Sequence, residues 1–310
     1  MAIADRYVEF GSREARGNSS IYERLSSAIA DDDELLGRLA TLPPTKQQPN
    51  LLFGVIRLLD GPLEPYAEFR AFVLDRWPVV AGEIKTRVTQ TNEVGRCAAL
   101  LPVLSALPQP LALIDVGCSA GLSLFPDKYA YRYGPTTIGE SAVTLDCAAV
   151  DIELPRALPT IVGRAGVDLN PLDITDPDAV AWLEALIWPE QQQRRDRLRT
   201  AIAIAAADPP QLMRGGLDAV PDLVAKAPLG ATPVVYHTSV LYLVAQAERA
   251  TFVETLRRLP GHWISIEAPD VVDLGELPAP PDDSALNVLA LDGKPLAWVR
   301  GHGQAIYGIA

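Results

Sequence analysis

A glycine-rich turn that follows an acidic residue carries the strongest chemical signal in the sequence. Residues 111–114 are apolar and Asp115 comes next. The turn then contains Gly117, Cys118, Ser119 and Gly121. This order is typical of a buried parallel strand that leads into a helix. Ligands bind at such junctions, because glycine lets the backbone approach them and the amides beyond it can donate to an anion. The acid at the strand end favours a cationic or hydroxyl-bearing ligand over a pyrophosphate.

Other polar side chains lie where predicted elements end. Asp168 ends a predicted strand that begins at Ile161, and His237 ends the strand predicted over 233–237. His237 acts either as a proton acceptor or as a core histidine paired with a neighbouring helix. The cluster of Asn92, Glu93 and Arg96 precedes an apolar run. These residues either close a pocket above the turn or form a surface helix cap and an ion pair. We rank Glu267, Asp173, Asp218, Tyr131 and Tyr133 below these as pocket candidates.

The elements needed to position these groups divide the chain into two parts. Residues 1–107 show helical spacing without strand alternation, which predicts an all-helical cap. Residues 108–310 alternate strands with helices, which predicts an α/β domain with an insertion at about 125–160. Two strands joined by Asp292-Gly293 predict a closing antiparallel hairpin. We place the helices after the second strand at 176–188 and 190–206, and another at 240–259.

Composition narrows the class of partner. The chain has 310 residues, of which 48% are hydrophobic, and a formal net charge of −12. Such a charge disfavours a nucleic-acid partner, and the basic run 194–199 is expected to form a solvated helix face. The three cysteines are far apart and the three histidines are isolated, which predicts neither a disulfide scaffold nor a metal site. With no signal peptide and no membrane-spanning run, the sequence predicts a cytoplasmic protein without a membrane partner. It leaves the oligomeric state open.

The chain resembles the class I methyltransferase superfamily. The first motif of that superfamily is an acid followed by three alternate glycines, and here Ser119 replaces the middle one in Asp115-Val-Gly117-Cys-Ser119-Ala-Gly121. More specifically, the chain is similar to an uncharacterised bacterial family, domain of unknown function 2332. The stretches that carry this similarity are 90–96, IDVGCSAGL, 129–134, GVDLNPLDITDP, 182–190 and VVYHTSVLYLV. The resemblance implies a Rossmann-like class I methyltransferase sheet, with the hairpin at its end and the helical cap before it.

The resemblance also implies a cofactor and roles for particular residues. It implies S-adenosylmethionine, with residues 117–121 around the methionine part of the cofactor and Asp115 ordering the turn or meeting its amino group. Asp168 would accept hydrogen bonds from the ribose hydroxyls, or else only cap Asn170-Pro171. His237 would take a proton from the nucleophile of a small-molecule substrate, with Asn92, Glu93 and Arg96 closing the pocket. The alternatives are a protein that binds the cofactor without turnover and a dinucleotide-dependent oxidoreductase.

Overall fold

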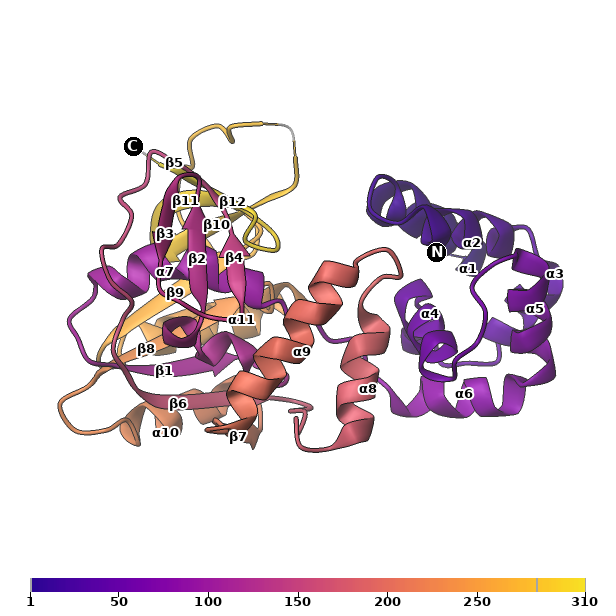
Figure 1. Ribbon diagram of the computed structural model, residues 1–310, viewed down its shortest axis with the longest axis horizontal. Coiled ribbons are helices and arrows are strands. Elements are labelled where there is room, and N and C mark those ends of the chain that lie inside the picture. The colour runs from indigo at the N-terminus through magenta and orange to yellow at the C-terminus, as the bar shows by residue number, and fades with distance from the viewer. Residues whose placement is uncertain (1, 283, 310) are drawn as a thin grey trace. The chain divides into compact units, whose positions relative to one another are not determined.

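The computed structural model describes residues 2–282 and 284–309, and Figure 1 traces them in chain order. The chain forms two compact units, each described below by itself. The helical unit runs to Thr91 and includes Asp173–Arg197, and the sheet unit comprises Asn92–Leu172 and Leu198–Ala310. The expected parts were 1–107 and 108–310, so residues 92–107 group with the sheet and 173–197 with the helices. The chain is therefore a mixed α/β protein with a discontinuous helical part.

The helical unit is built around one helix that is buried on nearly every side. That helix is α4 (Pro49–Leu58), in which Leu51–Ile56 are all buried. The other helices of this unit are α1 (Ile3–Phe10), α2 (Ser20–Ala30), α3 (Asp33–Leu39), α5 (Tyr66–Asp75), α6 (Trp77–Thr86), α8 (Pro177–Leu186) and the first residues of α9 (Gln192–Ala206). Trp182 of α8 lies in the same core and donates from its indole nitrogen to the Val88 carbonyl at 2.9 Å. This packing explains why Asp173–Arg197 belongs to the helical unit.

The sheet unit contains a nine-stranded sheet in the order β7-β6-β1-β8-β9-β10-β11-β12-β5. The strands are β1 (Leu111–Val116), β5 (Ala148–Val150), β6 (Ile161–Asp168), β7 (Gln211–Arg214), β8 (Thr232–Thr238), β9 (His262–Glu267), β10 (Leu286–Leu291), β11 (Lys294–Arg300) and β12 (Ala305–Gly308). The pairs from β7 to β9 are parallel, and β10, β11 and β12 continue in antiparallel pairs. The predicted hairpin across Asp292-Gly293 is confirmed as β10 and β11.

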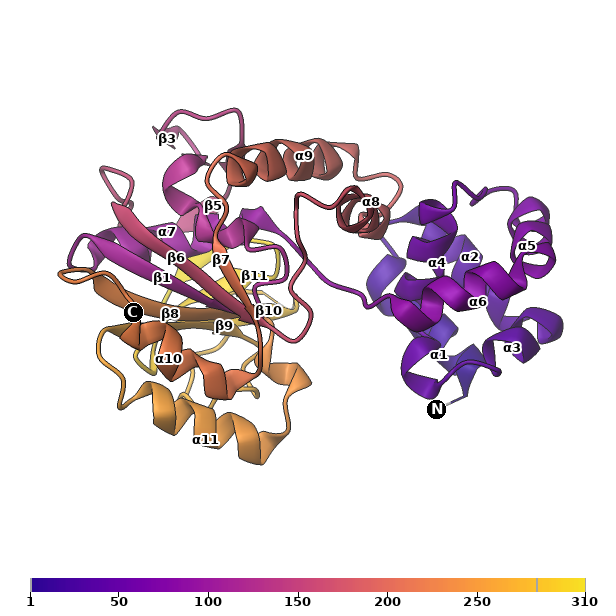
Figure 2. The same ribbon diagram turned by 90° about the horizontal axis from the view of Figure 1, so that it is seen from below.

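The order of the parallel strands creates a switch point between β1 and β8. The chain starts in the middle of the sheet at β1, moves outward to β6 and β7, and returns to β8 on the other side of β1. Because parallel crossovers are right-handed, this reversal sends later helices to the opposite face. Accordingly α10 (Val220–Ala225) and α11 (Gln246–Leu256) cover one face, while α7 (Cys97–Ala106) lies over the other (Figure 2). β1 is buried along its whole length.

The segment after the glycine turn differs from the prediction. The expected helix is wrong, because only a single 3₁₀ turn follows at Leu122–Leu124 before Pro126. Proline lacks an N–H and disfavours helical geometry in the residue before it, so the turn cannot extend. The chain instead forms a second sheet of β2 (Ala130–Tyr133), β3 (Thr136–Ile138) and β4 (Thr144–Asp146). This sheet occupies the predicted insertion. The helix predicted at 240–259 also begins later, at Gln246.

No helix within residues 2–282 and 284–309 combines the length and apolar character that a membrane-spanning helix needs.

The tight packing of α4 gives a test of the helical unit. A Cβ atom added at Gly54 would lie 3.0 Å from the Trp182 ring, whereas one added at the exposed helical Gly82 would meet nothing within 4 Å. We therefore expect Gly54→Val to lower the free energy of unfolding by about 1–3 kcal/mol through overpacking. Gly82→Val should change it by less than about 0.5 kcal/mol. Chemical denaturation followed by circular dichroism measures both. Equal effects of the two substitutions would contradict the packing described here.

Candidate functional site

Buried polar side chains of the sheet unit gather where the parallel strands end. They come from β1, β8 and β9 and from the segments that adjoin these ends. The set consists of Glu93, Asp115, Ser119, His237, Thr238, Ser265 and Glu267. Buried polar groups need partners, and such groups are unfavourable in a core that serves stability alone. This edge also holds the switch point between β1 and β8, where open α/β sheets bind ligands. It is therefore the candidate functional site.

Every backbone N–H from Gly117 to Gly121 donates to an acceptor within the protein. The acceptors are the Val167 carbonyl for Gly117 and Cys118 (2.8 and 3.2 Å), Asp168 Oδ2 for Ser119 (2.8 Å), Asn92 Oδ1 for Ala120 (3.0 Å) and the Cys118 carbonyl for Gly121 (2.7 Å). The sequence analysis expected amides free to donate to a ligand, and the structure shows them already used. A turn without free N–H groups is a poor site for a pyrophosphate.

The two glycines of the turn are required by the protein's own packing. Gly117 and Gly121 have φ angles of +74° and +70°, in the left-handed region that favours glycine. A Cβ at Gly117 would lie 2.5 Å from a methyl group of Val240, and one at Gly121 would lie 2.9 Å from Leu212. The close approach expected of a ligand is thus made here by side chains from other elements. Cys118 is also buried.

Two carboxylates lie behind and beside the turn. Asp168 is half-buried, and its two oxygens accept from the backbone N–H groups of Ser119 and Asn170 at 2.8 and 2.7 Å. Asp115 is buried and accepts a short hydrogen bond from the Ser123 hydroxyl. Burial raises the pKa of Asp115 to about 7, although the Ser123 hydrogen bond opposes this shift. Of the two acids, only Asp168 presents a surface to solvent that a ligand could contact.

Asn92 connects the start of the sheet unit to the turn. Its amide nitrogen donates to Ser119 Oγ at 2.6 Å, and its oxygen accepts from Ala120 N–H at 3.0 Å. Ser119 has a φ angle of +49°, which is uncommon for a residue with a side chain. The two hydrogen bonds stabilise this conformation at the position where the resemblance expects a glycine. Asn92 therefore lies beside the turn, as expected, and it binds the turn itself.

Glu93 and Arg96 also bind backbone groups of the sheet unit. The expected helical face does not form, since Asn92 and Glu93 precede the 3₁₀ turn Val94–Arg96. Glu93 Oε1 accepts from Gly95 N–H at 2.9 Å. The Arg96 guanidinium donates to the Thr238 carbonyl at 2.7 Å and to the Gly301 carbonyl at 3.1 Å. Arg96 thus holds the end of β8 to the turn between β11 and β12.

His237 is fully buried and paired with the carboxylate at the end of the next strand. Its Nδ1 lies 2.9 Å from Glu267 Oε1, and its ring stacks on Trp263 with centroids 6.1 Å apart. The same Glu267 oxygen accepts from the N–H groups of Val240 and Leu241 at 2.9 and 3.0 Å. The pair therefore fixes the segment that follows β8 and leads over the glycine turn. With no exposed surface, His237 does not reach a substrate in this conformation.

Two residues that sequence reasoning missed complete this edge. Ser239 adopts a φ angle of +55°, and its Oγ accepts from Asn287 Nδ2 at 3.0 Å. Ser119 and Ser239 thus hold left-handed conformations directly after the neighbouring strands β1 and β8. Such backbone strain concentrates at functional sites, which supports the location of the site. Neither a serine after a strand nor an asparagine fifty residues later gives a sequence signal for this geometry.

Other expected pocket residues lie elsewhere. Tyr131 and Tyr133 are buried in the small sheet and donate to the carbonyls of Pro126 and Ala98, so an entrance or exposed-face position is wrong. Asp173 belongs to the helical unit and accepts from Thr175. Asp218 is an exposed residue of a 3₁₀ turn. Within the described residues, no group of three or more His, Cys, Asp or Glu side chains is placed to hold a metal ion.

The buried state of Asp115 predicts a pH-dependent stability. Its raised pKa means that between about pH 4 and pH 7 the folded chain retains a proton that the unfolded chain has released. Stability therefore falls as pH rises through this window. Asp115→Asn keeps a neutral acceptor for Ser123 and does not titrate. The free energy of unfolding of this variant, relative to that of the unsubstituted protein, should therefore increase by about 1.4 kcal/mol for each unit by which the pH is raised, up to pH 7. Denaturation series at several pH values test this. The exposed change Asp270→Asn should show no such trend.

The triple role of Glu267 Oε1 predicts a second stability effect. Glu267→Ala leaves the N–H groups of Val240 and Leu241 and the His237 ring without their acceptor. We expect a loss of about 2–4 kcal/mol and fast hydrogen exchange at residues 240 and 241. Glu267→Gln retains an acceptor and should lose less, and the exposed Glu276→Ala should be neutral. Unchanged exchange at these two amides in Glu267→Ala would contradict this role.

Comparison with known proteins places the chain in a family. No curated protein matches the sequence. A family model described as an uncharacterised protein conserved in bacteria matches residues 4–306, which is nearly the whole chain. The similarity seen in the glycine turn and in the segments around Asp168 and His237 is thus part of a match that includes both units. The chain belongs to the family of uncharacterised bacterial proteins known as domain of unknown function 2332 (DUF2332).

Proposed function

We propose that the protein binds S-adenosylmethionine at the carboxyl ends of β1 and β6 and transfers a methyl group to a small molecule. One observation carries this proposal: all N–H groups of the turn are used internally, while Asp168 beside the turn is only partly buried. Such a site offers acceptors and negative charge rather than donors. It suits a ligand with hydroxyl groups and positive charge, as S-adenosylmethionine has.

The donors and acceptors at Asp168 fit the ribose of this cofactor. An ionised carboxylate can accept about four hydrogen bonds. The backbone N–H groups of Ser119 and Asn170 take two of these positions. The remaining acceptor positions of Asp168 would bind the ribose hydroxyls. When bound, the cofactor supplies a methyl group on a sulfonium, and the nearby negative charge of Asp168 favours such a cation.

The sheet supports the same assignment at the level of fold. Its parallel strands follow the order β7-β6-β1-β8-β9, and the antiparallel hairpin of β10 and β11 comes next, with β12 and β5 beyond it. A hairpin of this kind is expected for a class I methyltransferase-like sheet rather than for a dinucleotide-binding sheet. The used N–H groups also disfavour a dinucleotide oxidoreductase, because a pyrophosphate needs free donors at this turn.

The chain's own residues would act mainly by alignment. Methyl transfer is an in-line displacement, so fixing the acceptor relative to the methyl group supplies much of the rate. Asn92 holds the turn, and Arg96 holds the end of β8. The His237–Glu267 pair holds the segment that starts at Ser239. In this proposal all of these are positioning residues.

A second candidate function is cofactor binding without turnover. The full burial of His237 favours it, because the expected proton acceptor has no access to a substrate. In this alternative the protein reports on cofactor levels, and the hydrogen-bonded edge serves binding alone. The two functions share the same binding site and differ in whether the methyl group leaves it.

Calorimetry with S-adenosylmethionine, S-adenosylhomocysteine and NAD tests the shared step. We expect both sulfur compounds to bind and NAD to give no heat. Asp168→Asn should weaken binding by about tenfold or more, because it removes a charged acceptor. The exposed change Asp222→Asn should leave binding unchanged. No heat with either sulfur compound would overturn the proposal.

A second measurement separates turnover from binding. The protein is incubated with methyl-labelled S-adenosylmethionine and a bacterial small-molecule extract. Transfer of the label to another small molecule, abolished in Asp168→Asn, supports the methyltransferase. Binding of the sulfur compounds without any transfer supports the second candidate.

A further inference from the structure

We propose that the sheet unit binds an extended acidic peptide segment, which adds as a strand to the open part of the β6 edge. This proposal concerns a different region from the site at the carboxyl ends of the strands and does not depend on the proposed function. It rests on an incomplete strand pairing, on a cavity beside it, and on the charges that surround the cavity.

Half of β6 has a neighbour on one side only. β1 pairs with β6 from Ile161 to Val167. β7 pairs only with Ala165–Asp168, so within the described chain no strand covers the outer side of Ile161–Arg164. The residues before β7 are Pro209 and Pro210, which cannot supply the N–H groups that would extend the pairing. The unpaired edge measures about 13 Å for four residues and is available to another strand.

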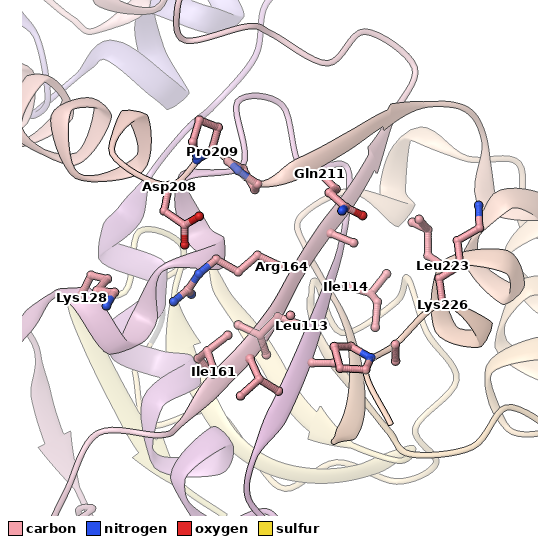
Figure 3. A pocket seen from close by; sticks show the side chains of 17 residues that line it. Leu113, Ile114, Lys128, Ile161, Arg164, Asp208, Pro209, Gln211, Leu223 and Lys226 are labelled. Carbon is pink, nitrogen blue, oxygen red and sulfur yellow. The ribbon is translucent and has the colours of Figure 1, made fainter. Parts of the chain in front are cut away.

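A cavity of about 400 Å³ follows this edge (Figure 3). Residues 161–165 all line it, as do residues 208–211 before and at the start of β7. The end of α10 and the residues after it, from Leu223 to Pro228, form another part of the lining. The cavity therefore lies directly against the unpaired edge.

The cavity extends over both faces of the sheet. On the face covered by α10 it is lined by Ile114, Gly163 and Leu223, and Pro228 packs against Gly163 there, 3.0 Å from the place a Cβ atom would take. On the other face it is lined by Leu113 and by Arg164, whose guanidinium donates to the Leu124 carbonyl. A strand places successive side chains on opposite faces, so an added strand would fill both parts. Strand addition of this kind is a recurring mode of peptide binding.

The charges around the cavity favour an acidic partner. Lys128, Arg164 and Lys226 line it, with Asp208 as the one acid in the lining. Arg164 is paired with Asp127 through two hydrogen bonds of 2.8 and 2.7 Å. The Lys128 ammonium also lies 3.8 Å from Asp127, but its side chain is 53% exposed, so Lys128 and the exposed Lys226 are the accessible cations. A chain with a net charge of −12 thus carries a locally basic groove.

The same charges disfavour a second copy of this chain as the partner. A symmetric pairing of two β6 edges would place the same patch against itself. Lys128 and Lys226 would then contribute to a shared groove with four lysines, which opposes association. Lysines at an open edge also protect it from such self-pairing. A peptide with alternating apolar and acidic side chains satisfies the edge, and its acidic side chains, which all point to one face, pair with the lysine on that face.

The test uses the full chain and a fluorescent capped peptide, Val-Glu-Val-Glu-Val, followed by fluorescence anisotropy at low salt. We expect saturable binding, together with slower hydrogen exchange at residues 161–164. The peptides Val-Lys-Val-Lys-Val and Val-Glu-Pro-Glu-Val should bind at least tenfold more weakly, because one reverses the charge and the other interrupts strand pairing.

Matched variants locate the site. Lys128→Glu combined with Lys226→Glu should weaken binding of the acidic peptide by about tenfold, because the two substitutions replace two positive charges at the groove with two negative ones. Lys85→Glu combined with Lys294→Glu makes the same charge change at exposed positions outside the groove and should have little effect. Circular dichroism checks that both variants fold.

Several outcomes would overturn the proposal. These are no binding of the acidic peptide, equal binding to the two double variants, and protection confined to residues outside the β6 edge. Dimerisation of the unsubstituted chain in sedimentation, lost on Val162→Lys at the edge, would assign the edge to a second copy instead.

Discussion

The need to pair buried backbone N–H groups determines how the candidate site is built. β1 is buried on both faces and along its full length, so the turn that follows it starts inside the protein rather than at its surface. Each N–H of that turn needs an acceptor, because an unpaired buried donor is costly. Val167, Asp168 and Asn92 supply four of these acceptor contacts from β6 and from the start of the sheet unit, and the Cys118 carbonyl within the turn accepts from Gly121. The site's shape and its electrostatic character both follow from this pairing.

One consequence concerns what the glycine turn recognises. A glycine-rich turn after a strand usually offers donors to a phosphate. Here the donors are used, and the exposed groups beside the turn are the acceptors of Asp168. The same sequence motif can therefore favour opposite ligand charges, depending on which partners the rest of the chain brings to the turn. Electrostatics separates the two possibilities more clearly than the motif does.

Sequence patterns predicted those features that depend on neighbouring residues. The apolar run of β1, the acid at the end of β6 and the hairpin at Asp292-Gly293 all arise from local order, and the structure contains them. The missing helix after the turn could also have been expected from Pro126, because its effect is local. The partners of the turn amides were not predictable, since they come from residues 92, 167 and 168.

Burial was equally difficult to infer where long-range packing decides it. Tyr131 and Tyr133 alternate like an exposed strand face, yet both are buried and their hydroxyls find backbone acceptors. His237 ends a strand, as expected, but Trp263 and Glu267 surround its ring. Residues 173–197 give a helical pattern, and nothing in that pattern indicates that Trp182 packs with α4 rather than near the strands on either side of it in the chain.

The discontinuity of the helical unit has a consequence for the order in which the protein folds during synthesis. Helices α1 to α6 leave the ribosome first, but their shared core still lacks Trp182 and α8. Before those residues emerge, β1, the small sheet and β6 have already been made. The first unit to begin folding therefore cannot be completed until part of the second has been made. The exposed surface of α4 must persist until more than half of the chain has been translated.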